Sequence, residues 1–245
     1  MRRIETHQTP HQTLEIWRSE MATEFRVQGA IHAWHHHRAL LTGLAWDLIA
    51  AGCLLRASGP PRSILMLGLA GGTSCRVLRR LLPDTHITAL DIDPGMIALA
   101  RQHMALDSLN LRVIVTDAYQ WLEKNTETFD VVFDDIYLAG AEDVFRPKAW
   151  DEHILANLCK AMAPNGLLGI NLVTGPGHRK MQSLTRRVLK NHFPVVRSLS
   201  TPASMNEVLM AGKDVSNRKS LLDFRAKFSQ KKDQAYWDKI RMRRL

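Results

Sequence analysis

The sequence predicts an α/β fold in which helices cover both faces of a largely parallel sheet, and three observations support this. Five short apolar runs alternate with helical segments between residues 63 and 191. These runs are almost continuously apolar, as is typical of parallel strands that are buried on both faces. The connections between runs and helices are short. This alternation is typical of a doubly wound sheet.

The composition is that of a globular protein. The 245 residues are 45% hydrophobic and 23% charged, which excludes collagen-like and disordered classes. The longest apolar stretch, residues 40–55, contains Asp47 and is too short to span a membrane. No apolar run of the secretory type follows the N-terminal arginines. We therefore expect a cytoplasmic protein whose three widely spaced cysteines are reduced.

The chain is expected to begin with a small β-element over residues 1–32. Its apolar segments read LEIW and EFRVQGAIH, with Gly29 at a turn. Helical spacing of apolar residues then predicts a helix over about 33–56, which the prolines of SGPP close. Residues 33–212 are expected to form the main domain.

The main domain is expected to contain seven strands. Five of them should be parallel: 63–68, 86–92, 111–116, 129–135 and 166–173. The helices are expected at 73–82, 93–104, 117–124, 148–162 and 178–191. Asp93 and Pro94 are a typical N-cap and first residue of a helix. The runs 195–200 and 206–212 are separated only by a loop, so we expect an antiparallel pair added to one sheet edge.

Residues 213–245 are expected to form a basic C-terminal helix or tail. They hold eleven Lys or Arg against four Asp, and so carry most of the net charge of +9. We interpret this segment as a solvated amphipathic helix that buries Leu221, Phe224 and Phe228. It contains no groove-reading motif, so we do not expect nucleic acid as a partner. The part after Ser229 is expected to be dispensable for folding.

A glycine-rich loop, Gly68-Leu69-Ala70-Gly71-Gly72-Thr73, follows the first parallel strand and leads into a helix. Glycines allow a ligand to approach the backbone, and a helix N-terminus offers free N–H groups. Asp91, followed by Ile92, ends the next strand, where an acidic residue binds ribose hydroxyls. No Gly-Lys-Ser/Thr follows, so the loop is not a P-loop. A Rossmann-like nucleoside site is favoured over a turn that binds nothing.

Two further carboxylate motifs end the third and fourth parallel strands. They are Thr116-Asp117-Ala118 and Asp134-Asp135. The carboxyl ends of parallel strands meet at one crevice, so these carboxylates should lie near Asp91. This succession resembles the class I methyltransferase fold, which binds S-adenosylmethionine.

Within that fold the sequence is similar to spermidine synthase and related polyamine aminopropyltransferases over residues 13–212. The similarity rests on ILMLGLAGGT, LDIDP, TDA and FDVVFDD. It implies that Asp91 and Ile92 hold the ribose, Asp117 and Ala118 hold the adenine, and Asp135 accepts a proton from the attacking amine. The glycine loop, with Gly68, Ala70, Gly71 and Gly72, would contact the same nucleoside.

The resemblance also assigns residues outside these motifs. His32 falls at the place of a gating glutamine, and His37 retains one member of a Tyr-His-Glu motif. Both would border the nucleoside. Tyr137 is a candidate catalytic residue in the wall of the acceptor pocket. Asn171 and Trp150 are further candidates for that wall.

The sequence departs from the family where the family binds a polyamine. Ala70 replaces an aspartate of the glycine loop, and Leu138 replaces a second acceptor-site aspartate. Arg38 stands where the family has a glutamate. Polyamines are multiply cationic and favour acidic sites. These replacements predict weak or absent activity with putrescine.

A metal site is not expected. His32 and His36 would share one face if the predicted helix reached them, but no cysteine or carboxylate cluster joins them. Asp134 and Asp135 are a possible magnesium pair, yet neighbouring strand residues point to opposite faces. Only one of the two should therefore enter the crevice.

The predicted function is transfer of an aminopropyl or methyl group from S-adenosylmethionine or its decarboxylated form to a small nucleophile. Two alternatives remain open: a methyltransferase with another acceptor, and a catalytically silent nucleoside-binding protein. The motif Asn/Asp-Pro-Pro-Tyr is absent after the fourth strand, where residues 134–137 read DDIY. This argues against methylation of nucleic-acid bases. The expected partner is a small-molecule substrate, with no membrane, and the chain is compatible with a homodimer.

Overall fold

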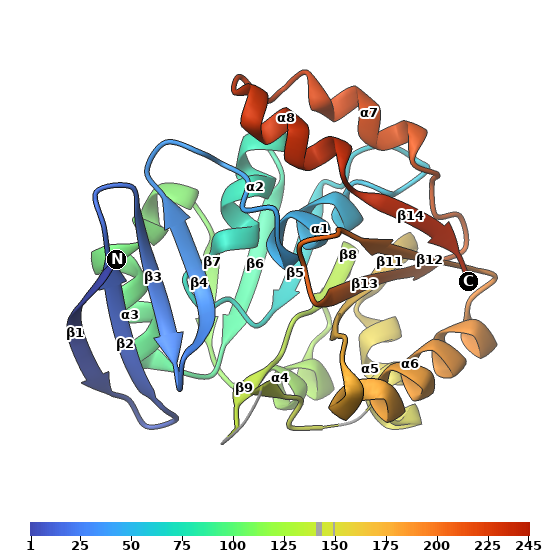
Figure 1. Ribbon diagram of the computed structural model, residues 1–245. Coiled ribbons are helices and arrows are strands. Elements are labelled where there is room, and N and C mark those ends of the chain that lie inside the picture. Colours follow the sequence, from blue (N-terminus) through green and yellow to red (C-terminus); the bar gives the residue numbers. More distant parts are fainter. Residues whose placement is uncertain (141–143, 149) are drawn as a thin grey trace.

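A computed structural model describes residues 1–140, 144–148 and 150–245. Its main sheet has eight strands in the order β14-β12-β13-β11-β8-β5-β6-β7 (Figure 1). The strands are β5 (Ser63–Leu67), β6 (His86–Asp91), β7 (Arg112–Val115), β8 (Phe129–Asp134), β11 (Met162–Val173), β12 (Val195–Ser200), β13 (Asn206–Gly212) and β14 (Arg241–Arg244). All seven predicted strands are therefore present, and β14 is an addition.

Five strands of this sheet, β7, β6, β5, β8 and β11, are parallel. β13 pairs with β11 and β12 in antiparallel orientation, which confirms the predicted pair at one edge. β6 and β7, which follow β5 in the chain, lie on one side of β5 in the sheet. β8, the next strand of this sheet along the chain, lies on the other side of β5. The crevice between β5 and β8 is consequently the switch point at which such sheets bind ligands.

Helices cover both faces of the sheet, as predicted. They are α1 (Ala45–Cys53), α2 (Thr73–Leu81), α3 (Pro94–His103), α4 (Ala118–Lys124), α5 (Glu152–Lys160) and α6 (Arg179–His192). Alternate strand residues separate the two cores: Met66 packs with α1 and α2, whereas Leu67 packs on the opposite face. No helix in the described ranges is long and apolar enough to cross a membrane.

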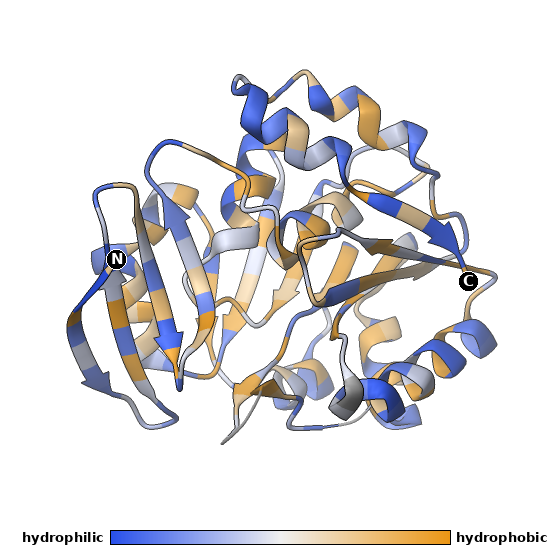
Figure 2. Ribbon diagram, viewed as in Figure 1, coloured by the Kyte–Doolittle hydropathy of each residue, from blue (hydrophilic) through white to orange (hydrophobic). Residues whose placement is uncertain are grey.

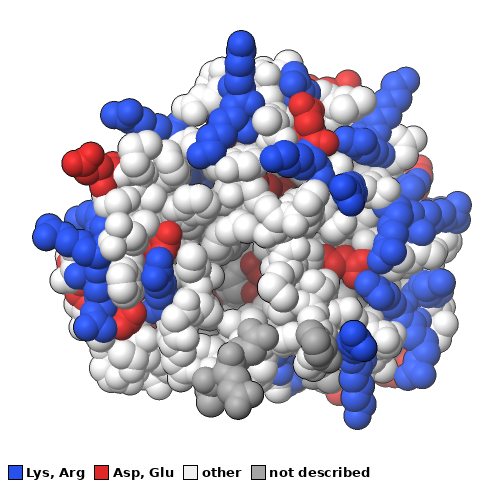
Figure 3. Space-filling view, in the orientation of Figure 1, with Lys and Arg blue, Asp and Glu red and all other residues white. Residues whose placement is uncertain are grey.

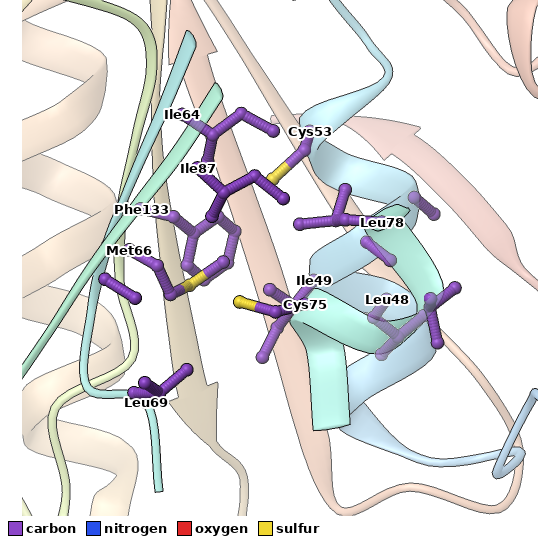
Figure 4. Packing of buried hydrophobic residues seen from close by; sticks show 14 of the residues in the cluster. Leu48, Ile49, Cys53, Ile64, Met66, Leu69, Cys75, Leu78, Ile87 and Phe133 are labelled. Carbon is purple, nitrogen blue, oxygen red and sulfur yellow. The ribbon is translucent and has the colours of Figure 1, made fainter. Parts of the chain in front are cut away.

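The core between the sheet and α1 and α2 is closely packed (Figure 4). Ile64, Ile87 and Phe133 extend from the strands toward Leu48 and Leu78 of the helices. These side chains are almost completely buried. Hydropathy follows the same layers, because the central strands are apolar while helix surfaces and the outermost strands are hydrophilic (Figure 2).

The N-terminal residues form a separate four-stranded antiparallel sheet. Its strands are β1 (Arg2–Gln8), β2 (Thr13–Arg18), β3 (Ala22–Val27) and β4 (Ala30–His36). This sheet is tied to the main domain through Thr9, whose hydroxyl donates to Asp93 at 2.6 Å. Trp34 N likewise donates to the Thr73 hydroxyl at 2.9 Å. The strands β2, β3 and β4 extend the predicted β-element, and β1 was not predicted.

The predicted helix over 33–56 is wrong in its first part. Residues 33–36 continue β4, and α1 begins only at Ala45. The intervening loop is held by two buried carboxylates: Asp47 accepts from Thr42 N and Gly43 N, and Asp233 accepts from Leu41 N at 3.0 Å. Burial raises the pKa of Asp47 to about 7. His32 and His36 therefore lie on a strand rather than on one helix face.

The C-terminal segment is not a single helix. It forms α7 (Lys219–Arg225), α8 (Lys231–Asp238) and β14, which pairs with β12. Trp237 and Ile240 are only 3% and 2% exposed, and Trp237 Nε1 donates to Leu221 O at 2.8 Å. The expectation that residues after Ser229 add little core is wrong. Trp237 and Ile240 belong to the same core as α1 and α2, and β14 forms the edge strand of the main sheet.

Candidate active site

A cavity of about 690 Å³ opens at the carboxyl ends of the parallel strands, at the switch point between β5 and β8. Figure 3 shows a hollow on this side with acidic atoms within it, whereas Lys and Arg stand mainly at the periphery. The cavity wall brings together ten of the sequence-predicted residues: His32, Gly68, Ala70, Gly72, Asp91, Ile92, Asp117, Ala118, Asp135 and Tyr137. Gly71 and His37 do not belong to this wall.

The glycine loop lies against the chain that follows β8. Gly68 has a φ of +87°, and a Cβ there would be 2.5 Å from the carbonyl oxygen of Asp135. A Cβ on Gly71 would meet Ala33 of β4 at 2.6 Å, so Gly71 allows the glycine loop to pack closely against the N-terminal sheet. Gly68 therefore allows the glycine loop and the predicted proton acceptor to approach each other.

We expect Gly68→Ala to lower stability and to displace Asp135. The added methyl group collides with backbone, which cannot rotate away as a side chain can, so a cost of at least 1–3 kcal/mol (roughly that of overpacking) is expected. Thermal unfolding measures it. Gly29→Ala is the matched control, since its φ of +83° is similar but no atom lies within 4 Å of the added carbon. Equal destabilisation of both variants would contradict the proposed close approach.

Asp91 connects the end of β6 to the glycine loop. Its Oδ2 accepts from Leu69 N at 3.1 Å and Ala70 N at 2.8 Å, and its Oδ1 accepts from Asp93 N at 3.0 Å. Burial raises the pKa of this carboxyl group, while the backbone donors oppose that rise. Asp91 thus shapes the loop as well as facing the cavity, a role that the sequence did not indicate.

Asp117 begins α4 at the end of β7. Its Oδ1 accepts from Tyr119 N at 2.9 Å and Gln120 N at 3.0 Å, which caps the helix. Among the described residues, no hydrogen bond occupies Oδ2. That oxygen can accept a donor from a ligand in the cavity.

The two predicted histidines lie in different environments. His32 lines the cavity, and its Nε2 is buried without a hydrogen-bond partner among the described residues. Burial lowers the pKa of His32, so the ring is neutral and can bond a ligand. His37 lies just beyond β4, where its ring nitrogens face Glu20 O at 3.0 Å and the Thr23 hydroxyl at 3.4 Å. His37 therefore forms hydrogen bonds with neighbouring residues of β3 and the loop before it, and it does not line the cavity.

Asp135 follows β8 and faces the cavity. Its Oδ1 accepts from Asn171 Nδ2 at 2.8 Å, and Asn171 Oδ1 in turn accepts from Asn206 Nδ2 at 3.1 Å. Burial raises the pKa of Asp135 to about 7, although the Asn171 bond and the charge of Arg146 oppose this rise. A carboxylate with such a pKa can accept a proton near neutral pH.

Asp134 points to the opposite face of β8, as the strand alternation predicted. Its carboxylate accepts from Arg146 Nη1 at 2.9 Å, Trp150 Nε1 at 2.6 Å and the Tyr119 hydroxyl at 3.0 Å. Trp150 therefore belongs to this buried network and not to the cavity wall. No group of three potential metal ligands occurs in the described ranges. Arg146 was not predicted from the sequence, because no motif distinguishes this residue from other basic residues.

The hydroxyl of Tyr137 is held by the backbone of β11. It donates to Asn171 O at 3.0 Å and accepts from Val173 N at 3.1 Å. The guanidinium carbon of Arg146 lies 4.9 Å from the centre of the ring. Because the hydroxyl is occupied on both sides, we revise the prediction that Tyr137 is catalytic: it positions β11 and forms part of the cavity wall.

Comparison with known proteins identifies relatives of two kinds. A family described as a methyltransferase domain matches residues 64–166. The "eEF1A lysine and N-terminal methyltransferase homolog" of Drosophila pseudoobscura pseudoobscura is 28% identical over an alignment of 163 residues; the match covers 62% of this chain and 24% of that protein. The polyamine aminopropyltransferase of Neisseria meningitidis serogroup A is 25% identical over 170 residues, 69% of this chain and 63% of that one. The chain thus spans less than two thirds of either relative.

A solved structure shows the same fold. Spermidine synthase in complex with the transition state analogue AdoDATO superimposes with a TM-score of 0.71 and 16% sequence identity. The match covers 89% of this chain and 76% of that structure. The similarity therefore extends over most of the chain, and it confirms the predicted fold class.

Proposed function

We propose that the chain is a diverged, spermidine synthase-like member of the class I S-adenosylmethionine-dependent methyltransferase superfamily, and that it transfers an alkyl group from a sulfonium nucleoside to a small nucleophile. The donor is S-adenosylmethionine or its decarboxylated form. One observation carries this proposal: Asp135, with a pKa raised to about 7, lies beside the glycine loop in the same cavity as Asp91 and Asp117.

The residues of the cavity fit such a nucleoside. The carboxylate of Asp91 would bind the ribose hydroxyls, and Asp117 Oδ2 would accept from the adenine amino group. The backbone of the glycine loop would lie along the ligand, because Gly68 and Gly72 both line the cavity. The buried Nε2 of His32, which has no partner among the described residues, would give the ligand a further polar contact in this cavity.

The bound sulfonium supplies an electrophilic carbon together with a neutral thioether as leaving group. The protein must then align a nucleophile with that carbon and remove its proton. The nucleophile's lone pair forms the new bond while the carbon–sulfur bond breaks toward sulfur, and Asp135 takes the proton. Asn171 holds Asp135 in place and favours its ionised form through the 2.8 Å hydrogen bond.

The product nucleoside identifies the reaction. Aminopropyl transfer leaves methylthioadenosine, whereas methyl transfer leaves S-adenosylhomocysteine, so incubation with each donor and a panel of amines distinguishes the two. We expect one of these products to form and Asp135→Asn to prevent its formation. Nucleoside binding without either product would favour the catalytically silent alternative.

We expect Asp91→Ala to weaken nucleoside binding by about 1.5–3 kcal/mol, the range for hydrogen bonds to a charged group. Titration calorimetry measures this loss. The unfolding temperature of the variant must be measured as well, because Asp91 also accepts hydrogen bonds from the amides of Leu69 and Ala70, and their loss could destabilise the loop. Asp107→Ala, at a carboxylate whose side chain is 76% exposed, is the matched control and should bind normally. Unchanged affinity in a folded Asp91 variant would show that the nucleoside does not bind as proposed.

A further inference from the structure

A buried guanidinium group joins the two strands from which Asp135 and Asn171 extend. Arg146 follows β10 (Val144–Phe145), and its side chain is only 1% exposed. Its Nη2 atom donates to the carbonyl oxygen of Asp134, at the end of β8, at 3.1 Å and to that of Asn171, on β11, at 3.2 Å. The guanidinium group holds its N–H donors in a rigid planar arrangement. Arg146 therefore fixes the ends of these two strands relative to each other.

The same guanidinium group binds the Asp134 side chain, which supports the backbone around Asp135. Nη1 of Arg146 donates to both carboxylate oxygens of Asp134, at 3.0 and 2.9 Å. Asp134 Oδ1 also accepts from Ile136 N at 3.1 Å, so this carboxylate bridges the peptide groups on either side of Asp135. Asp135 N donates to Leu67 O of β5 at 2.8 Å. The backbone of the proposed proton acceptor is consequently held by β5 and, through Asp134, by Arg146.

Two opposite charges act on Asp135 from within this network. Burial raises the pKa of Asp135, and the neighbouring Asp134 carboxylate raises it further, whereas the Arg146 cation lowers it. The thiol of Cys75 on α2 and the hydroxyl of Tyr137 also interact with Asp135, but burial raises the pKa of both groups, so they are neutral near pH 7. Loss of Arg146 alone would thus leave Asp135 beside a carboxylate whose charge is no longer offset.

We propose that Arg146 is a positioning residue for the proton transfer: it aligns Asp135 with Asn171 and offsets the negative charge of Asp134 beside the proton acceptor. This inference rests on the proposed function and adds to it a residue that does not line the cavity. A buried ion pair that serves stability alone can often be replaced by neutral residues. Here both charges of the pair also act on Asp135. Removal of Arg146 should therefore change the response to pH in addition to the stability.

The first test measures the ionisation of Asp135 in the ligand-free, full-length protein. The carboxyl ¹³C resonance of Asp135, identified by its absence in Asp135→Asn, is followed as the pH is raised. Arg146→Gln removes the cation but retains Asp134, so the titration midpoint should move up by about one pH unit or more, the usual effect of a nearby charge. The rising limb of kcat/KM should move with it. Addition of Asp134→Asn removes the opposing charge and should return the midpoint toward that of the wild-type protein.

Arg146→Lys tests the alignment separately from the charge, and it serves even if Arg146→Gln alone does not fold. Lysine keeps the positive charge but has one nitrogen, which cannot reproduce the bonds of both Nη atoms. We expect the midpoint of Asp135 to stay close to that of the wild-type protein. The kcat should fall about tenfold or more, because small misplacements of a catalytic group are costly, while nucleoside affinity is unchanged. A normal kcat in this variant would overturn the alignment role.

Arg56→Gln is the matched control for the loss of a cation. Arg56 pairs with Asp130 at 3.1 Å near the start of β8, and these side chains are 16% and 13% exposed. This variant should leave the midpoint of Asp135 unchanged. A midpoint that does not move in Arg146→Gln, or that moves equally in Arg56→Gln, would overturn the proposal. The midpoint is measured without a donor, so its failure to move is distinct from failure to bind a nucleoside, which would refute the proposed function.

Discussion

Asp135→Asn is expected to reduce the transfer rate by about 10²–10⁴-fold, the contribution typical of general acid–base catalysis. An amide cannot accept the nucleophile's proton, but it has the size of the carboxylate and leaves Asp91 and Asp117 unchanged. Steady-state kinetics should therefore show a lower kcat, while calorimetry shows unchanged nucleoside affinity. A variant with a normal kcat would exclude Asp135 as the proton acceptor.

The pH profile provides the control for this prediction. Asp135 must be ionised to accept a proton, so kcat/KM should rise with pH and level off above about 7. Asn171 donates to the ionised carboxylate, and its bond therefore lowers the pKa of Asp135. Asn171→Ala removes that donor and should shift the rising limb to higher pH. A limb that does not move would show that another group titrates.

Deletion of residues 230–245 is expected to abolish or nearly abolish stable folding. Loss of Trp237 and Ile240 removes about 1.5–3 kcal/mol each. Loss of Asp233 leaves the amides of Leu40 and Leu41 without their acceptor, at about 1–3 kcal/mol each. The total approaches the roughly 5–15 kcal/mol of a typical domain. Circular dichroism during heating measures the effect.

The control for this deletion separates charge from packing. The full-length double variant Lys231→Gln and Arg244→Gln removes two exposed charges but retains the buried side chains and β14. It should unfold at the same temperature as the wild-type protein. A truncated chain with a wild-type unfolding temperature would show that the C-terminal segment contributes nothing to stability.

The strands and the order of the site motifs could be predicted because local signals there agree with the fold. Apolar runs such as 63–68 are buried on both faces, so no polar alternation obscures them. Asp91, Asp117 and Asp135 each lie at or just after the carboxyl end of a strand, and the topology alone brings strand ends together. The positions of these carboxylates in one cavity followed from the sequence for that reason.

Other features depend on contacts between distant segments, and no local pattern indicates them. Residues 33–36 have helical spacing, yet pairing with β3 makes them a strand. Trp237 and Ile240 are surrounded in sequence by basic residues, so their burial is not apparent until α8 packs on the domain. Arg146 is recognisable only through Asp134, its buried partner. Each error arose where tertiary packing overrides local preference.

Calorimetric titration of the intact protein with S-adenosylmethionine, its decarboxylated form and methylthioadenosine tests the central claim most directly. The cavity should bind at least one of the two sulfonium donors with a dissociation constant between about 1 μM and 1 mM, the usual range for enzyme substrates. It should also bind methylthioadenosine, which retains the ribose and adenine that Asp91 and Asp117 would hold. Absence of binding by all three nucleosides at about 1 mM would contradict the assignment of this cavity as a nucleoside site.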